Sequence, residues 1–388
     1  MGKRIGLLTG EGDAPGLNFC LKTIVHGAID RGHEVVGIRK GWQGLIYYDP
    51  DEPVTHADNA MIMTKPKVRT IDQLAGSYLH SSRIDPGNCH PQEAPPFLRV
   101  SATQDQPLDL TNHIKRAIEH LQLDVLIVLG ANTSLKYGAR LSQEGIPVIG
   151  IPKSVHNDIS GTTYSLGFSS ALRRGVNFVN EIRDIAASRE EIAVIAVLGH
   201  DSGLATMLIA SFANADRTLI PEVPFNPQPL AEHLIEDKRK NPSNYAILVM
   251  SEGSRIDPTT APEEIARLSA DIVVAGQRGS GAMTTRVLED IVGEHILYQP
   301  LSYLTRTGDT DGWDLVTATN FGIMAVDLIA NNTTGRLVSY RVEDGYIDVP
   351  LAEVTSPAVV NMADFYDANN YAPKSTIFTV AARRTLGL

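Results

Sequence analysis

A short stretch after a predicted buried strand carries five polar side chains in six positions: Lys153, Ser154, His156, Asn157 and Asp158. The apolar runs at 125–129 and 147–150 are short and rich in valine, isoleucine and leucine, as strands of a sheet covered on both faces must be. Open parallel sheets bind ligands at the carboxyl ends of their strands. This polar cluster is therefore the first candidate for the chemistry of the chain.

Two glycine-rich turns indicate that this chemistry involves phosphate. The first, residues 10–16, follows a predicted strand at 5–9 and precedes a predicted helix at about 17–31. Strand, glycine-rich turn and helix together point backbone N–H groups and a helix N-terminus at a phosphate. The turn at 130–134 opens another predicted helix in the same way. The first turn matches neither the dinucleotide pattern nor a P-loop, so a tight turn without a ligand remains the alternative.

Arg83 stands at the tip of a predicted loop, 76–83, beside small hydroxyl residues. A guanidinium in this setting suits bidentate contact with a phosphate, and a solvated surface position is the alternative. The following segment, 85–96, contains four prolines and little periodicity. We expect it to be a surface loop.

The order of the remaining elements predicts an α/β fold. Further strands are predicted at 34–39, Ile192–Val197, 218–221 and 246–250. Further helices are predicted at about 108–121, 169–183, 202–213, 281–292 and 313–329, with a loop at 41–44. Alternation of strands and helices argues for doubly wound, mainly parallel sheets, in two Rossmann-like lobes.

Length, charge and cysteine content restrict the class of protein. The 388 residues, 43% of them hydrophobic, suffice for two lobes with a core each. A formal net charge of −11 argues against a nucleic-acid or anionic-membrane surface. No apolar run approaches the ~20 residues of a membrane span, and a strand near Met1 leaves no room for a signal peptide. Cys20 and Cys89 are too few for a disulfide framework, and Cys20 is expected in the core. We expect a cytoplasmic protein.

Several ordered motifs resemble the phosphofructokinase family, which has ATP-dependent and pyrophosphate-dependent branches. They read L-T-G-E-G-D-A-P-G-L-N (8–18), G-W-Q-G-L (41–45), S-S-R (81–83), G-A-N-T-S (130–134), P-K-S-V-H-N-D-I-S-G-T (152–162), I-P-E-V-P-F (220–225) and L-S-Y-L-T-R-T-G (301–308). The resemblance runs from Ile5 to about Leu351. It implies a phosphofructokinase-type fold, with a donor lobe of residues 1–167 plus 305–355 and a sugar lobe of 168–304 plus 356–388. It also implies a homodimer or homotetramer.

The resemblance implies roles for residues at matching positions. Those of the donor site, for ATP or pyrophosphate, are Gly12, Trp42, Arg83, Asn132 and Ser134. Those that would orient the acceptor are Ser154, Gly199, His200, Glu222, Tyr303 and Arg306. Lys153, His156 and Asp158 would be catalytic, and Asp158 would also position Mg²⁺. Lys153 falls where the pyrophosphate-dependent branch has a lysine, which favours pyrophosphate as donor. Tyr303 as a plain core residue, and His156 as a turn residue that satisfies backbone groups, are the alternatives.

Departures from the family pattern point to an altered acceptor. His156 replaces the aspartate that serves as general base, and histidine is itself a suitable base near neutral pH. Asn132 replaces an acid of the donor loop. Glu191 and about Leu297 stand where the family has two arginines that grip a sugar 6-phosphate across a subunit interface. A glutamate repels a dianion, and neither residue replaces a guanidinium.

Three functions remain open. The first is a phosphotransferase that moves a terminal phosphoryl group from pyrophosphate or ATP to a sugar or polyol hydroxyl. The second is an ordinary 6-phosphofructokinase, which converts fructose 6-phosphate to fructose 1,6-bisphosphate and has compensating residues elsewhere. The third is a catalytically inactive paralogue that regulates by binding a sugar or nucleotide.

Overall fold

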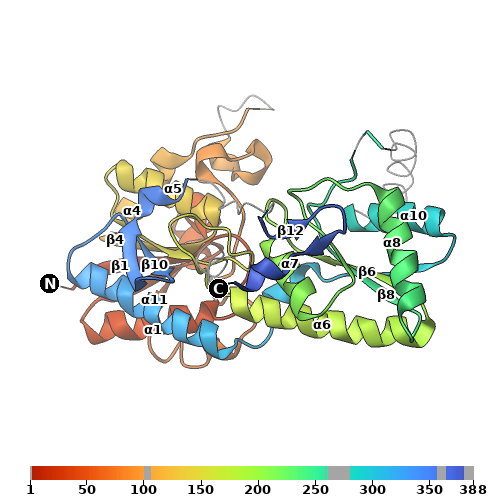
Figure 1. The fold of residues 1–388 in the computed structure, drawn as a ribbon. Coiled ribbons are helices and arrows are strands. Elements are labelled where there is room, and N and C mark those ends of the chain that lie inside the picture. The colour runs from red at the N-terminus through yellow and green to blue at the C-terminus, as the bar shows by residue number, and fades with distance from the viewer. Residues whose placement is uncertain (1, 100–105, 258, 261–279, 356–363, 380–388) are drawn as a thin grey trace. The chain divides into compact units, whose positions relative to one another are not determined.

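The computed structural model describes residues 2–99, 106–257, 259–260, 280–355 and 364–379 (Figure 1). The chain divides into two compact units. The first comprises Met1–Ser169 and Arg306–Pro357, and the second comprises Ser170–Thr305 and Ala358–Leu388. Parts of the expected sugar lobe, 356–363 and 380–388, lie outside the described residues.

The first unit contains a seven-stranded sheet in the order β11-β10-β5-β4-β1-β2-β3. Its strands are β1 (Arg4–Thr9), β2 (Glu34–Ile38), β3 (Ala60–Met63), β4 (Val125–Gly130), β5 (Val148–Pro152), β10 (Arg336–Arg341) and β11 (Gly345–Pro350). The central strands β10, β5, β4, β1 and β2 are parallel, and the two edge strands are antiparallel to their neighbours. Burial explains their composition, since every residue of β4 and β5 is buried.

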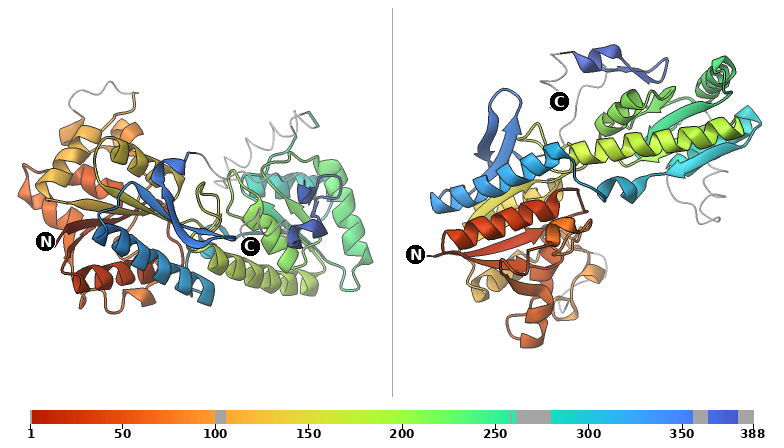
Figure 2. Two further views of the ribbon diagram at one scale, coloured as in Figure 1. Left: turned by 60° about the vertical axis from the view of Figure 1, so that its left-hand side comes forward. Right: turned by 90° about the horizontal axis from the view of Figure 1, so that it is seen from below.

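Helices cover both faces of this sheet (Figures 1 and 2). They are α1 (Leu17–Asp30), α2 (Trp42–Tyr47), α3 (His56–Asn59), α4 (Thr111–His120), α5 (Asn132–Gln143) and α11 (Gly312–Ala330). One apolar core lies under α1 and α11, and a second lies under α2, α4 and α5. Cys20 belongs to the first core, as predicted, and burial raises the pKa of its thiol.

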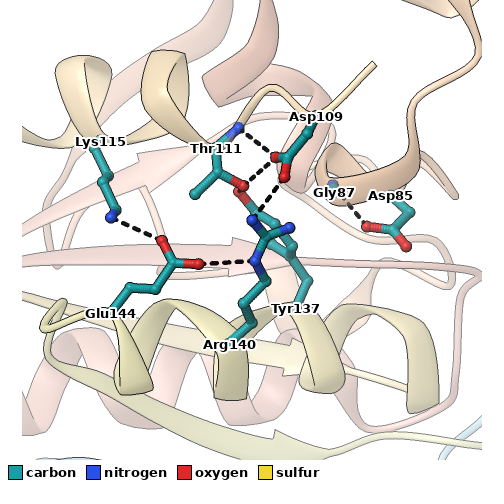
Figure 3. A network of polar contacts seen from close by, with 8 residues as sticks. All are labelled: Asp85, Gly87, Asp109, Thr111, Lys115, Tyr137, Arg140 and Glu144. Atoms are coloured by element: carbon teal, nitrogen blue, oxygen red, sulfur yellow. Dashed lines mark hydrogen bonds and ion pairs between the residues drawn. The ribbon is translucent and has the colours of Figure 1, made fainter. Parts of the chain in front are cut away.

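A polar network fixes α5 against α4 (Figure 3). Arg140 of α5 pairs with Asp109 at 2.6 Å and with Glu144 at 2.8 Å, and Glu144 also pairs with Lys115 of α4 at 2.7 Å. Beneath these ion pairs the buried Tyr137 hydroxyl bonds the Thr111 hydroxyl at 3.1 Å. The network positions α5, whose first turn contributes to the candidate site.

The second unit contains a four-stranded parallel sheet in the order β7-β8-β6-β9. Its strands are β6 (Ile192–Val197), β7 (Arg217–Leu219), β8 (Ala246–Ser251) and β9 (Ile296–Pro300), and a separate pair is formed by β12 (Tyr366–Asp367) and β13 (Ala372–Pro373). Its described helices are α6 (Phe168–Arg189), α7 (Leu204–Phe212), α8 (Pro227–Lys240) and α10 (Ser280–Val292). The predicted α/β class with mainly parallel sheets is confirmed.

Some elements differ from the prediction. The expected loop at 41–44 is the start of α2, because Trp42, Leu45 and Ile46 form a buried face. The expected surface loop at 85–96 consists of short 3₁₀ turns that bury Cys89 and Ala94. The helices and strands that the prediction omitted are α3, α8, β3, β9, β10, β11, β12 and β13.

One helix, α11, corrects the expectation about apolar runs. It is long and apolar enough to cross a membrane by length and composition alone. Its side chains Phe321, Ala325 and Ile329 are fully buried in the core shared with α1. Packing in this core accounts for the buried face of α11.

Candidate active site

Three neighbouring strands bring the polar cluster and the two glycine-rich turns together. β1, β4 and β5 are adjacent and parallel, so their carboxyl ends share one edge of the sheet. At this edge the Lys153 amide donates to the carbonyl oxygen of Gly130 at 3.0 Å, and the Gly10 amide donates to that of Leu129 at 2.9 Å. Backbone hydrogen bonds thus tie the three segments to one another.

Lys153 is a nearly fully buried cation at this edge. Its side chain is 2% exposed, and its Nζ donates to the carbonyl oxygen of Gly12. Burial lowers the pKa of the Lys153 ammonium to about 8. The charges of Arg306 and Arg83 lower the pKa of Lys153 as well, whereas the Glu11 carboxylate raises it. Three predicted site cations therefore act on the same small region.

Arg306 lies against both His156 and the first glycine-rich turn. Its Nη2 is 3.4 Å from Nε2 of His156. Arginine has no acceptor atom, so Nε2 must be the acceptor and the imidazole lacks a proton there. A Cβ at Gly12 would approach Nη1 of Arg306 to 2.7 Å, so the guanidinium lies directly against this glycine. The imidazole is thus held with a proton-accepting nitrogen beside a cation.

Ser154 and Asn157 shape the loop that carries His156 and Asp158. The Ser154 hydroxyl donates to Oδ1 of Asp158 at 2.7 Å and accepts from the amide of His156 at 3.1 Å. Asn157 has a positive φ of 55°, donates to the Thr163 carbonyl at 2.8 Å and accepts from the Ser165 amide at 2.7 Å. Asn157 is therefore a turn residue, while the side chain of His156 remains directed at Arg306.

The first turn of α5 brings Asn132 and Ser134 to the same edge. Asn132 donates through Nδ2 to the carbonyl oxygen of Asp158 at 3.1 Å. Its Oδ1 is buried and has no hydrogen-bond partner within the described part of the chain. Ser134 is 3% exposed, and a Cβ at Gly10 would come within 2.0 Å of its hydroxyl oxygen. The absence of a side chain at Gly10 allows this close approach of the two turns.

Glu11, which the sequence analysis did not single out, reaches the start of α5. Its carboxylate accepts one hydrogen bond from the Ala131 amide and another from the Thr133 amide at 3.0 Å. Its φ is 61°, in the left-handed region that favours glycine. The signal in the sequence was a glutamate between two glycines of a phosphate-type turn.

Trp42 was expected near a donor nucleotide, and the structure corrects this. The side chain is 1% exposed and packs edge-on against Tyr137, with ring centroids 4.8 Å apart. It belongs to the core under α2 and α5. A ring enclosed in this way offers no face on which a base can stack.

In the second unit, Gly199, His200 and Glu222 lie where β6 and β7 end. Gly199 and His200 follow β6, and a Cβ at Gly199 would lie 2.6 Å from the Ser251 hydroxyl oxygen. The Glu222 carboxylate accepts from the amide of Gly203, which precedes α7, at 2.8 and 3.1 Å. Burial raises the pKa of Glu222. His200 itself is exposed.

Tyr303 and Arg306 share a short 3₁₀ turn, Ser302–Arg306, but the two residues belong to different units. Tyr303 is 67% exposed, so the alternative that it is a plain core residue is wrong. The hydroxyl of the neighbouring Ser302 donates to Glu252 at 2.6 Å. Tyr303 thus projects from a turn that is anchored by its neighbour.

Glu191 directly precedes β6 and His200 follows it, so the two residues lie at opposite ends of this strand. The Glu191 carboxylate forms an ion pair with Arg189, whose Nε and Nη2 lie 2.9 and 3.0 Å from its oxygens. Nδ1 of His295 lies 3.5 Å from the same carboxylate. Ala193 pairs with Leu297 in the register of β6 and β9. Glu191 and Leu297 therefore lie near each other at the amino ends of these strands.

No group of three or more histidine, cysteine or carboxylate side chains that could hold a metal ion occurs among the residues that the structure describes. Mg²⁺ needs fewer protein ligands, because it commonly binds one or two protein oxygens and the phosphates of a substrate. The Asp158 carboxylate and the unpartnered Oδ1 of Asn132 are oxygens of the required kind, and Asn132 is tied to Asp158 through the Asp158 backbone carbonyl.

Comparisons with known proteins match the whole architecture. The phosphofructokinase family model matches residues 4–329. An ATP-dependent 6-phosphofructokinase of Sulfurihydrogenibium sp. is 32% identical over 344 residues, which cover 87% of this chain and 90% of the relative. A pyrophosphate–fructose 6-phosphate 1-phosphotransferase of Dictyoglomus thermophilum is 29% identical over 338 residues, covering 87% and 89%.

Solved structures agree at the level of the fold. The pyrophosphate-dependent phosphofructokinase of Marinobacter aquaeolei superposes with a TM-score of 0.73 at 16% identity, covering 99% of this chain and 91% of that one. The phosphofructokinase of Saccharomyces cerevisiae gives a TM-score of 0.68 at 21% identity, covering 91% of this chain and 45% of that one. At such identities the likeness concerns the fold alone.

Proposed function

Because the chain belongs to the phosphofructokinase family and is thus a phosphotransferase acting on an alcohol group, we propose that it transfers the terminal phosphoryl group of pyrophosphate to a sugar or polyol hydroxyl. The observation that carries the proposal is the buried ammonium of Lys153, held at the glycine-rich turn with Arg306 beside it. Such a cation at the carboxyl end of a sheet suits a small and highly charged donor.

The donor is held by the first glycine-rich turn at Gly12, by Arg83 and by the amides near Ser134. Phosphoryl transfer needs little covalent participation by the protein, so positioning and charge stabilisation dominate. Lys153 stabilises the charge that develops on the transferred group. The cost of placing a lysine where water is excluded supports a role beyond packing.

His156 accepts the proton of the attacking hydroxyl at Nε2. The hydroxyl oxygen forms a bond to phosphorus, the bridging oxygen of pyrophosphate leaves with its electron pair, and the products are a phosphate monoester and inorganic phosphate. The contact of Nε2 with Arg306 supports this role, because it presents the nitrogen without a proton. As the family resemblance implies, the acceptor would be oriented by Arg306, Glu222, His200 and Tyr303.

Asp158 and Asn132 would hold Mg²⁺ together with the donor. Ser154 keeps the Asp158 carboxylate in place through its 2.7 Å hydrogen bond. When bound, the ion neutralises charge on the phosphate oxygens.

Two observations bear on the donor. The burial of Trp42 supports pyrophosphate, because it removes the aromatic face that a nucleotide base would use. The names of the ATP-dependent relatives support ATP, which is therefore the second candidate.

The acceptor is the second open point. Glu191 is engaged with Arg189 at a position where the family pattern has an arginine, which supports a neutral sugar or polyol. Ordinary 6-phosphofructokinase activity is the alternative, and the names of the relatives support it. A cytoplasmic location and a homodimer or homotetramer stay predictions.

A matrix of donors and acceptors tests the proposal. Pyrophosphate and ATP are each combined with fructose 6-phosphate, free hexoses and polyols in the presence of Mg²⁺, and ³¹P NMR identifies the phosphate monoester. We expect product from pyrophosphate and a neutral acceptor. Product only from ATP would refute the donor assignment, product only from fructose 6-phosphate would refute the acceptor assignment, and no transfer at all would refute the proposal.

A further inference from the structure

The first turn of α5 already binds an anion, which is supplied by the chain itself. The carboxylate of Glu11 accepts from the amides of Ala131 and Thr133, 120 and 122 residues away in the sequence. These amides belong to the free N–H groups that every helix presents at its N-terminus and that favour negative charge. The helix has no side-chain cap of its own from Ala131 and no acidic residue in its first turn.

The backbone at Glu11 is arranged to deliver this carboxylate. Its φ of 61° is unfavourable for a residue with a Cβ, and the amide of Glu11 is tied to the Ser82 carbonyl at 2.7 Å. A Cβ at Gly10 would meet Ser134 and one at Gly12 would meet Arg306, so the turn lies directly against both side chains. A strained conformation is retained here although a local cap at Ala131 would satisfy the helix without it.

The charges around Glu11 explain what the carboxylate does in the absence of a ligand. Lys153 is buried, and the positive charges of Arg306 and Arg83 act on it. A buried cation without a counter-charge is costly, and Glu11 supplies the opposite charge together with Asp13, whose effect on the pKa of Lys153 is smaller. A donor phosphate that entered would bring negative charge to the same amides and cations.

We propose that Glu11 is a built-in competitor of the phosphoryl donor: its carboxylate occupies the amides at the start of α5 and leaves them when the donor phosphate binds. This inference rests on the proposed function, because it places the donor at these amides. Exchange of one anion for another keeps a counter-charge beside the buried Lys153 ammonium in both states. The residue thereby sets the threshold of donor concentration at which the site fills.

Calorimetric titration of pyrophosphate with Mg²⁺, without acceptor, tests the competition. The variants are Glu11→Gln, which keeps the size and removes the charge, and Glu11→Gly, which also removes the strain. Glu119→Gln on α4 is the matched control, since this exposed glutamate loses the same charge away from the site. We expect both Glu11 variants to bind pyrophosphate at least about tenfold more tightly than the parent, because charge-assisted hydrogen bonds no longer have to be broken.

Thermal unfolding provides a second readout that is independent of turnover. Without ligand we expect the Glu11→Gln variant to melt below the parent, because the first turn of α5 and the cations lose their counter-charge. Pyrophosphate should then raise its melting temperature more than it raises that of the parent. Glu119→Gln should follow the parent in both conditions.

The possible results separate the two proposals. If the parent and Glu11→Gln bind pyrophosphate with affinities within threefold of each other, the competitor role is refuted and the proposed function stands. Glu11 would then be a helix cap only. Failure of the parent and both variants to bind pyrophosphate or ATP would overturn the donor site and the competitor role together.

Discussion

Lys153 and His156 carry the chemistry at the scale of single residues, and they do so through opposite environments. Lys153 is enclosed by the protein, which lowers its pKa, while His156 is partly exposed and faces a guanidinium. Lys153 can stabilise negative charge on the donor, and His156 can exchange a proton with an acceptor. Each assignment can be tested by a single substitution.

Replacement of His156 by alanine removes the proposed proton acceptor. We expect turnover to fall by about 10²–10⁴-fold with acceptor affinity nearly unchanged, because the base acts in the transition state. Steady-state kinetics, with the acceptor that the donor–acceptor matrix yields, measures both quantities. His26→Ala on α1 serves as control. Turnover within threefold of the parent would remove His156 from the mechanism.

The lowered pKa of Lys153 predicts a pH dependence of donor binding. The pKa of Lys153 is about 8, so its side chain is protonated at lower pH and then attracts the donor phosphates. At higher pH the side chain loses this charge. Pyrophosphate affinity should therefore decrease as the pH rises through about 8. The unfolded chain keeps its lysine protonated to higher pH, so the same group makes the unfolding free energy rise with pH between about 8 and 10.4.

Lys153→Met separates this effect from the titration of pyrophosphate itself. Calorimetry from pH 7 to 9.5 should give a steeper loss of affinity for the parent than for the variant. At pH 7 the variant should also bind pyrophosphate more weakly than the parent does. Its loss of affinity for ATP should be smaller. Parallel pH profiles of the two proteins would show that Lys153 does not titrate in this range.

At the scale of elements, α5 depends on the polar network of Figure 3 for its position. Its first turn supplies Asn132 and Ser134, whereas its later turns carry Tyr137 and Arg140. Anything that loosens the later turns against α4 also loosens the amides that Glu11 occupies. The network is therefore a structural support of the site and lies outside the chemistry.

Replacement of Arg140 by alanine should destabilise the first unit by about 1 kcal/mol, because Arg140 joins Asp109 and Glu144. Arg116→Ala is the control, since Arg116 makes one exposed ion pair, with Asp51, and should cost less than about 0.5 kcal/mol. Urea unfolding followed by tryptophan fluorescence reports on this unit alone, because both tryptophans lie in it. Equal midpoints for the two variants would contradict the network.

At the scale of the whole molecule, the family resemblance assigns the positions of Glu191 and Leu297 to a sugar-phosphate contact across a subunit interface. Two missing arginines remove charge-assisted contacts worth about 1.5–3 kcal/mol each. We therefore expect fructose 6-phosphate to bind with a dissociation constant in the millimolar range or weaker, on the order of −4 kcal/mol. A neutral sugar or polyol should bind better.

Glu191→Arg should improve fructose 6-phosphate binding at least tenfold, because it exchanges repulsion for a guanidinium. Glu190→Arg is the matched control, with the same change of charge at an exposed neighbour. Micromolar binding of fructose 6-phosphate by the parent, measured by calorimetry, would refute the altered acceptor and the register assigned to Glu191.

The sequence by itself determined the fold class and the membership of the polar cluster. Buried strands such as β4 and β6 can be predicted from the sequence, because a short, uniformly apolar run is typical of a strand in a sheet covered on both faces. Turn residues such as Gly12 and Asn157 can be predicted from the sequence, because few residue types tolerate their geometry or their close contacts. The edge strand β11 and its neighbour β10 escaped prediction because many of their residues are only partly buried. On its other side β10 pairs with β5, which is distant in the sequence.

Tertiary structure alone decided what the individual side chains touch. Trp42 belongs to the core because α2 turns it against Tyr137, which its motif did not indicate. Glu11 reaches α5 across 120 residues of sequence, and Arg306 joins His156 across 150. A local sequence pattern reflects the backbone preferences of its residues and the periodicity of their burial. Both depend on residues that are close in the sequence. Contacts between loops at the end of a sheet depend on strand order and register, which only the folded chain fixes.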